Sequence, residues 1–237
     1  MKDVLQFLKK RHSDRRLYDP QRPIKKEDLH QILEAGSWAS TAHNMQNFQV
    51  VVVDDRQLLE TIGGLKYMVS RNFLRENYQQ LSFSEEELRQ KKTGLLSKRF
   101  SETFLNPESA PKDLVYEGLG KAIASSAALL VVLYNPNHRA PDSEGDFFGI
   151  ISLGCVMENM WLMAEALGIS CHIVSFLGNP SVAPEVKKIL GIPGELKIAY
   201  SCRMGYPVEG PAGTDAFRVR RDVEDFTSYN CFGSEKN

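Results

Sequence analysis

The sequence predicts an α+β fold or a three-layer sandwich of helices around a sheet. Short apolar runs typical of buried strands alternate with segments of helical periodicity. One connection, residues 57–127, is far longer than a crossover between parallel strands needs, which argues against a regular doubly wound sheet. The 237 residues suffice for one large domain or two small ones, and 42% hydrophobic residues are ordinary for a soluble globular protein.

Two helices and a strand are expected before residue 55. Residues 2–10 place Val4, Leu5 and Leu8 on one helical face. Residues 24–36 repeat this spacing, and Gly36 is a plausible end of that helix. The four valines within residues 48–54 predict a buried strand.

Residues 57–127 read as mostly helical and more polar, and 60–118 form a helical excursion from the sandwich. Aromatic side chains are spread through this charged stretch, which leaves two interpretations open. They could anchor amphipathic helices to the domain, or they could line a lid for flat substrates. The aromatic residues are Tyr67, Phe73, Tyr78, Phe83, Phe100 and Phe104.

The second half of the chain continues the alternation of strands and helices. Strands are expected at 127–135, 169–177 and 197–203, with a helix from about 181 to 190 that Gly191 would end. Residues 147–169 predict a long helix that is apolar around most of its surface. Such a helix must be buried on most sides, so it is a central helix or part of a subunit interface. Its polar positions interrupt it too often for a membrane span.

The net charge and the cysteine spacing argue against several classes of partner and metal site. A net charge of −1 suggests neither nucleic acid nor an anionic membrane as a partner. The four cysteines have no zinc-site spacing, and the N-terminus lacks the apolar core of a signal peptide. We therefore expect no metal and a cytoplasmic location.

Two polar segments carry the candidate chemistry. Residues 11–18 hold three arginines and a serine within six positions, which is either a small anion site or a solvated basic turn. Residues 40–48 form a polar loop in front of the valine strand. Its donors and acceptors suit the polar edges of a flat heteroaromatic ring, or it simply leads into the strand.

These segments, taken in order with two later ones, resemble the nitroreductase family of FMN-dependent oxidoreductases. The family's Arg-x-Ser-x-Arg motif is matched by Arg11, Ser13 and Arg15. Its Asn-x-Gln spacing is matched by Asn44 and Gln46, although Asn47-Phe48 replaces the usual Pro-Trp. A Gly-Tyr-Pro turn at 205–207 and a basic tail at 217–221 complete the set.

The resemblance implies a fold and a cofactor site. The fold would be a three-layer α/β/α sandwich around a mixed or antiparallel sheet, with one FMN-binding domain over 1–237 and an extended tail at 208–237. Arg11, His12 and Ser13 would hold the FMN phosphate, and Arg15 would act catalytically at the N1/O2 edge. The other implied contacts are Ser40, Thr41, Ala42, Asn44 and Gln46 from the partner subunit, Val174, Ser175 and Phe176 near N5 and O4, and Arg218 with Arg220 or Arg221 over the phosphate.

The implied activity is that of a homodimeric NAD(P)H oxidoreductase. NADH or NADPH would reduce FMN, and a nitroaromatic, quinone or similar small aromatic acceptor would then oxidise it. A specialised flavin reaction on the same fold, such as dehalogenation, flavin destruction or ring dehydrogenation, is the alternative enzyme. A flavin-binding module without activity is the alternative outside enzymes. The lack of a clear acid–base set fits a protein whose cofactor carries the chemistry.

Overall fold

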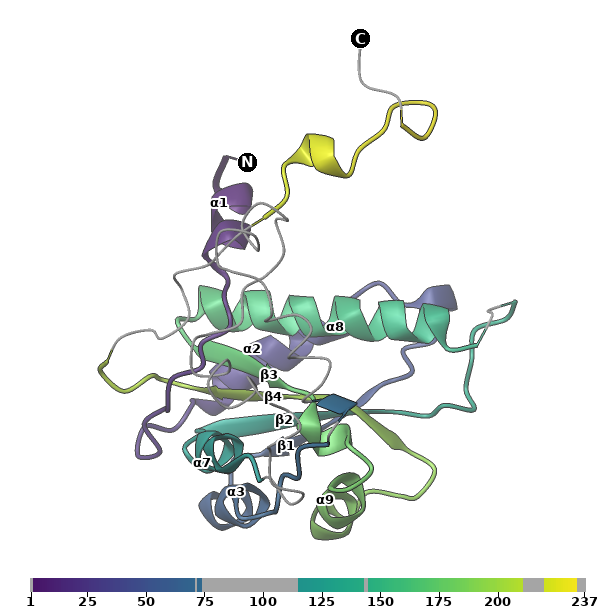
Figure 1. Ribbon diagram of the computed structural model, residues 1–237. Helices are drawn as coiled ribbons and strands as arrows, with labels where there is room; N and C mark the ends of the chain where they lie inside the picture. Colours follow the sequence, from purple (N-terminus) through teal and green to yellow (C-terminus); the bar gives the residue numbers. More distant parts are fainter. Residues whose placement is uncertain (1, 71, 74–114, 143–144, 211–219, 234–237) are drawn as a thin grey trace. The chain divides into compact units, whose positions relative to one another are not determined.

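The computed structural model describes residues 2–70, 72–73, 115–142, 145–210 and 220–233 (Figure 1). The chain divides into two compact units. The first comprises Met1–Met68 and Val115–Pro211, and the second comprises Val69–Leu114 and Ala212–Asn237. All the strands and helices below belong to the first unit.

A four-stranded antiparallel sheet forms the centre of the first unit. Its strands are β1 (Gln49–Val53), β2 (Ala128–Tyr134), β3 (Ser170–Val174) and β4 (Lys197–Gly205), in the order β1-β2-β4-β3. All three pairings are antiparallel. The predicted α+β class is confirmed, and within the described residues the sheet is antiparallel rather than mixed.

Helices cover both faces of this sheet, as Figure 1 shows. Helices α2 (Lys26–Ser37) and α8 (Phe147–Ala166) pack on one face, and α3 (Arg56–Gly63), α7 (Glu117–Ala124) and α9 (Ala183–Leu190) pack on the other. Strand β2 contributes to both hydrophobic cores because its successive side chains point to opposite faces of the sheet. Leu130 and Val132 join the α2–α8 core, whereas Leu129 and Val131 join the opposite one. The result is the expected three-layer sandwich.

Helix α1 (Lys2–Lys10) forms where it was predicted, but its apolar face finds no cover in the described part of the chain. Val4, Leu5 and Leu8 are all exposed. Gly36 is not the end of α2, which continues to Ser37. A Cβ at this position would lie 2.8 Å from Met160 Cγ, so the glycine permits α2 and α8 to pack closely.

Within the single chain, helix α8 is buried on one face only, so it is not a central helix, and the alternative of a subunit interface stays a prediction. Leu153, Val156, Met160, Trp161 and Ala164 face the core. By length and composition alone the helix could cross a membrane, so the argument that its polar residues interrupt it too often is wrong. Core helices of soluble proteins pass the same test, and α8 packs on α2 and the sheet. Its outer face keeps a row of exposed apolar side chains: Phe147, Phe148, Ile150 and Ile151.

A pair of glycines joins α3 and α7 on the opposite face. A Cβ on Gly120 would lie 2.3 Å from the Gly63 carbonyl oxygen, and a Cβ on Gly63 would lie 2.7 Å from the Gly120 carbonyl oxygen. Both backbones therefore approach within a distance that any side chain would prevent. Gly63 and Gly120 therefore permit the close packing of α3 on α7.

The long excursion is only partly described. Residues 74–114, which include Tyr78, Phe83, Phe100 and Phe104, lie outside the described residues. Tyr67 is buried, and its hydroxyl donates to the Ile62 carbonyl over 2.6 Å. This tyrosine therefore packs in the core of the first unit.

Candidate functional site

The loop that follows α1 is fastened to the edge of β3. The Asp14 N–H donates to the Cys171 carbonyl over 3.1 Å. Four residues later Tyr18 bridges to Pro207, and its hydroxyl donates back to the Asp14 carbonyl over 2.8 Å. Gly205 is required here, because a Cβ would lie 2.9 Å from the Tyr18 side chain. The arginine-rich segment is therefore held in a defined conformation.

The Asp14 carboxylate organises this loop from inside. It accepts hydrogen bonds from the Arg16 N–H and Nε, from Arg16 Nη2 at 2.6 Å and from Ser170 Oγ at 3.0 Å. Burial would raise the Asp14 pKa, but the hydrogen bonds from Arg16 and Ser170 outweigh it and hold the pKa below its usual value. Asp14 is thus a charged anchor at neutral pH.

We expect Asp14→Asn to lower stability only where Asp14 is ionised. A carboxyl with a lowered folded-state pKa stabilises the fold above the unfolded value of 3.8, and this stabilisation is lost as pH falls through the folded-state pKa. The variant should lose about 2 kcal/mol of unfolding free energy at pH 7, the scale of hydrogen bonds to a charged group. Urea denaturation from pH 7 to pH 3 measures both curves, which should converge at the acid end.

A surface pair provides the control for this measurement. Glu60 pairs with Arg56 at 3.3 Å but is largely exposed. Glu60→Gln should therefore change the unfolding free energy by less than about 1 kcal/mol. Curves for Asp14→Asn and the wild type that stay parallel down to pH 3 would show that the Asp14 charge does not anchor the loop.

The structure gives different roles to the arginines of this loop. Arg11 Nε pairs with Glu158 of α8 at 3.2 Å, and its guanidinium stacks 4.3 Å from the Trp161 ring centre. Arg16 is bound to Asp14, and His12 Nδ1 contacts the Lys10 carbonyl at 3.0 Å. Ser13 is partly buried. Arg15 is the exposed arginine of the loop.

A buried arginine that the sequence analysis did not select lies beneath the loop. Arg203 of β4 is fully buried. Its Nη2 donates to the carbonyls of Asp14 (3.0 Å) and Arg16 (2.8 Å), and its Nε donates to His172 Nδ1 (3.1 Å). Burial, together with the charges of Arg203 and Arg15, lowers the His172 pKa to about 3. His172 is therefore neutral under physiological conditions.

Arg15 shares its surroundings with the segment that follows β3. Its charge acts on His172 of β3 and on Tyr116, just before α7. The Tyr116 ring meets the Phe176 ring edge-on, with centres 6.3 Å apart. Tyr116 therefore lies within the electrostatic reach of Arg15 and also contacts Phe176 of the segment after β3.

The segment after β3 differs from the predicted strand. The strand ends at Val174 instead of continuing to 177, because Ser175 adopts helical dihedral angles and Phe176–Gly178 form a short helix, η2. Gly178 passes Ile198 so closely that a Cβ would lie 2.9 Å from the Ile198 carbonyl oxygen. The Val174 side chain is buried in the core, whereas Ser175 is exposed.

The second predicted segment forms a strained polar loop. His43, Asn44 and Gln46 have φ of 51°, 53° and 47°, and Ala42–Asn44 form the short helix η1. The Ala42 N–H donates to Ser152 Oγ of α8 over 3.0 Å. Three left-handed residues within four positions are unusual outside glycine and often accompany a functional loop.

A small hollow lies beside this loop. Thr41 and Ala42 contribute to it, but none of the residues around Arg15 does. Its lining otherwise comes from Met45, Asn47, the end of β2 and the following turn, and the start of α8: Tyr134, Asn135, His138, Arg139, Ala140, Gly145, Asp146, Gly149 and Ser152.

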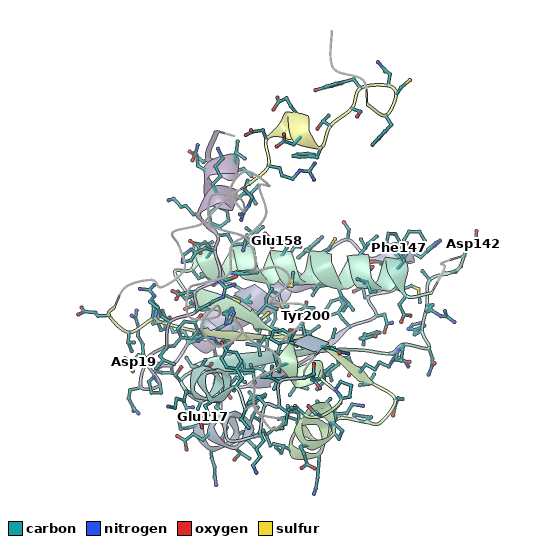
Figure 2. All side chains as sticks on the ribbon, in the orientation of Figure 1. Asp19, Glu117, Asp142, Phe147, Glu158 and Tyr200 are labelled. Atoms are coloured by element: carbon teal, nitrogen blue, oxygen red, sulfur yellow. The ribbon has the colours of Figure 1, made fainter. Side chains whose placement is uncertain are left out.

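The two predicted segments contact different parts of α8. The polar loop reaches Ser152, whereas the arginine loop reaches Glu158, six residues or about 9 Å further along the axis. Figure 2 shows Phe147 and Glu158 at well-separated points of this helix. None of the contacts among the described residues joins Ser40, Asn44 or Gln46 to Arg15. Arg218 lies outside the described residues, and Arg220 is an exposed residue of the second unit.

Comparison with known proteins decides the family. The model of the nitroreductase family matches residues 8–206, from the end of α1 to the Gly-Tyr-Pro turn. The chain belongs to the nitroreductase family. This confirms the resemblance seen in the sequence, and with it the prediction that the protein is an oxidoreductase.

The relatives of this nitroreductase-family chain are distant. An NADPH-dependent oxidoreductase of Staphylococcus aureus (strain MRSA252) is 23% identical over 236 residues, which cover 98% of this chain and 75% of that protein. A nitroreductase with bound FMN from Bacteroides fragilis has a TM-score of 0.55 at 23% identity, covering 89% of this chain and 91% of that one. An FMN-dependent nitroreductase from Clostridium difficile has a TM-score of 0.57 at 16% identity, covering 97% and 100%. These structures confirm the fold.

Proposed function

We propose that this chain is an FMN-dependent NAD(P)H oxidoreductase that reduces nitroaromatic, quinone or related acceptors in alternating half-reactions. The observation that carries the proposal is that the charge of Arg15 acts on His172 of β3 and on Tyr116, whose ring contacts Phe176 just after β3. Further support comes from the FMN named for the Bacteroides fragilis structure and the NADPH named for the Staphylococcus aureus relative.

The residues present suit such a cofactor. Arg15 offers an exposed cation, and Ser13 and His12 precede it on the same anchored loop, so an anionic group there meets several donors. Tyr116 and Phe176 offer apolar ring surface beside them. FMN, when bound, supplies the two-electron chemistry. Arg15 would stabilise negative charge at the N1/O2 edge, and Ser175 and Phe176 would fix the opposite edge.

The test is to purify the chain and record its absorbance spectrum. We expect a yellow protein that releases FMN on denaturation and oxidises NADPH or NADH when a quinone or nitroaromatic is present. A colourless protein that neither quenches the fluorescence of added FMN nor oxidises NAD(P)H would overturn the proposal. Bound FMN without turnover of any such acceptor would favour a specialised flavin reaction.

We also propose that the active form is a homodimer. Only 28% of the most apolar stretch of α8 is buried in the single chain, and its outer face exposes Phe147, Phe148, Ile150 and Ile151. Soluble monomers rarely leave so large an apolar patch uncovered. A second chain on this face would also supply its polar loop at Ser40–Gln46, as the resemblance to the family implies. The cytoplasm is the proposed location, because all four cysteines are free thiols.

A charge on the outer face of α8 should therefore break the dimer. We expect the wild type to sediment as a dimer at micromolar concentration and Ile150→Asp to sediment as a monomer that has lost FMN. Leu58→Asp, on the exposed side of α3, is the matched control and should remain a dimer. A stable, FMN-loaded wild-type monomer would contradict the shared site.

A further inference from the structure

Arg203 is a cation in an unusual setting. It is fully buried, and none of the ion pairs among the described residues includes it. Its Nη1 has no hydrogen-bond partner in the described part of the chain, and its guanidinium stacks 4.2 Å from the Tyr18 ring centre. The nearby Asp14 charge favours the Arg203 cation, but it does not form a direct ion pair with it. Burying a charge without a direct ion pair is costly, so such residues are rare without a specific role.

The contacts of Arg203 show which segment it holds, namely the arginine loop around Arg15. One nitrogen, Nη2, donates to the carbonyls of Asp14 and Arg16 at 3.0 and 2.8 Å. These two residues flank Arg15. The carbonyl groups of the residues before and after Arg15 are therefore bound to a single buried nitrogen, while the Arg15 side chain is exposed.

His172 completes the arrangement. Its Nδ1 accepts from Arg203 Nε over 3.1 Å, which leaves the proton of the neutral ring on Nε2. Burial is the main reason that the His172 pKa falls to about 3, and the charges of Arg203 and Arg15 lower it further. Since the ring stays neutral, it does not add a second positive charge to repel Arg15 from its place.

We infer that Arg203 is a positioning residue, which fixes the direction of Arg15 toward the N1/O2 edge of the cofactor. This inference rests on the proposed function, because it needs Arg15 to act on bound FMN. Arg203 itself does not touch the cofactor. The guanidinium suits this task because its rigid fork binds two carbonyls and one ring nitrogen at fixed angles, which a lysine ammonium cannot do at once.

The decisive experiment combines Arg203→Lys with Arg15→Ala and measures the midpoint potential of bound FMN. Arg203→Lys keeps the positive charge but removes the fork. We expect it to reduce the equilibrium constant for two-electron reduction about tenfold, which is about 30 mV. In the Arg15→Ala background the same change should alter the constant less than twofold. Equal shifts in both backgrounds, or no shift with Arg15 present, would overturn the inference.

A milder variant covers the case in which Arg203→Lys fails to fold. Tyr18→Phe removes the hydroxyl that donates to the same Asp14 carbonyl. It should shift the constant about threefold in the same direction, again only when Arg15 is present. Tyr200→Phe is the matched control. Tyr200 lies in β4, as Arg203 does, but on the opposite face of the sheet, where its hydroxyl donates to the Leu153 carbonyl. A Tyr18→Phe shift that matches Tyr200→Phe, or that persists without Arg15, would overturn the inference.

Hydrogen exchange on the cofactor-free protein separates this inference from the proposed function. Peptides covering residues 11–17 should exchange faster in Arg203→Lys than in the wild type and be unchanged in Tyr200→Phe. Faster exchange in a protein that never binds FMN would overturn the proposed function, and with it the role of Arg203 in redox tuning, but not the anchoring of the loop. Unchanged exchange in an FMN-binding protein would overturn the positioning role alone.

Discussion

Gly120→Ala should destabilise the protein by about 3 kcal/mol, at the upper end of what an overpacked contact costs. The added Cβ would lie 2.3 Å from the Gly63 carbonyl oxygen, which is backbone and cannot rotate aside. Helices α3 and α7 must then separate, and the core residues Leu59, Ile62 and Ile123 lose contacts. Urea denaturation of the two proteins side by side measures the loss.

Gly64→Ala is the matched control. Gly64 follows α3 with φ of −76°, and its Cβ would meet only carbonyl oxygens of its own helix, at 3.3 and 3.5 Å. Alanine adopts this conformation without strain, so this variant should be neutral or slightly stabilising. Equal stability of Gly120→Ala and Gly64→Ala would show that the two helices do not pack through their glycines.

Arg15→Ala should lower the midpoint potential of bound FMN and slow its reduction by NADPH by tenfold or more. A cation beside N1 stabilises the negative charge of the reduced ring, and one charge-assisted contact contributes roughly 1–3 kcal/mol. The cofactor should remain bound, because the phosphate contacts predicted for Arg11, His12 and Ser13 are untouched. Redox titration and stopped-flow reduction measure the two effects.

Arg22→Ala controls for the loss of an exposed arginine. Arg22 lies 3.6 Å from the Tyr206 ring centre, away from the Arg15 surroundings in sequence and in its contacts. Its removal should leave potential and rate unchanged. A potential for Arg15→Ala identical to that of the wild type would remove Arg15 from its catalytic role.

Local sequence patterns predicted the elements well because each had a one-dimensional signature. The four valines of β1 and the apolar run of β2 lie within their predicted ranges, and Gly191 ends α9 with the left-handed φ of 63° that such an end requires. Gly36 misled the prediction, because a glycine needed for contact with another helix looks the same in sequence as one that ends a helix.

The site was harder to predict because its supports are distant in sequence. Arg11, Ser13 and Arg15 were selected from their spacing, but Arg203 lies 189 residues from Asp14, the residue whose carbonyl it holds. One local signal was available: a charged residue between Cys202 and Met204, in the interior of a predicted strand. An arginine in a buried strand needs hydrogen-bond partners. The sequence does not identify these partners, because they become apparent only once the arginine loop is placed on the strand.

The attachment of the arginine loop to β3 has a consequence for solubility. Strand β3 lies at the edge of the sheet, where unpaired backbone groups invite another chain to add a strand. The Asp14 N–H donates to the Cys171 carbonyl at that edge, so the loop proposed to bind the cofactor also covers it. Mutations that free this loop to accept new substrates would therefore uncover an aggregation-prone edge. The freedom of the site to evolve is limited by the need to keep β3 from joining other chains.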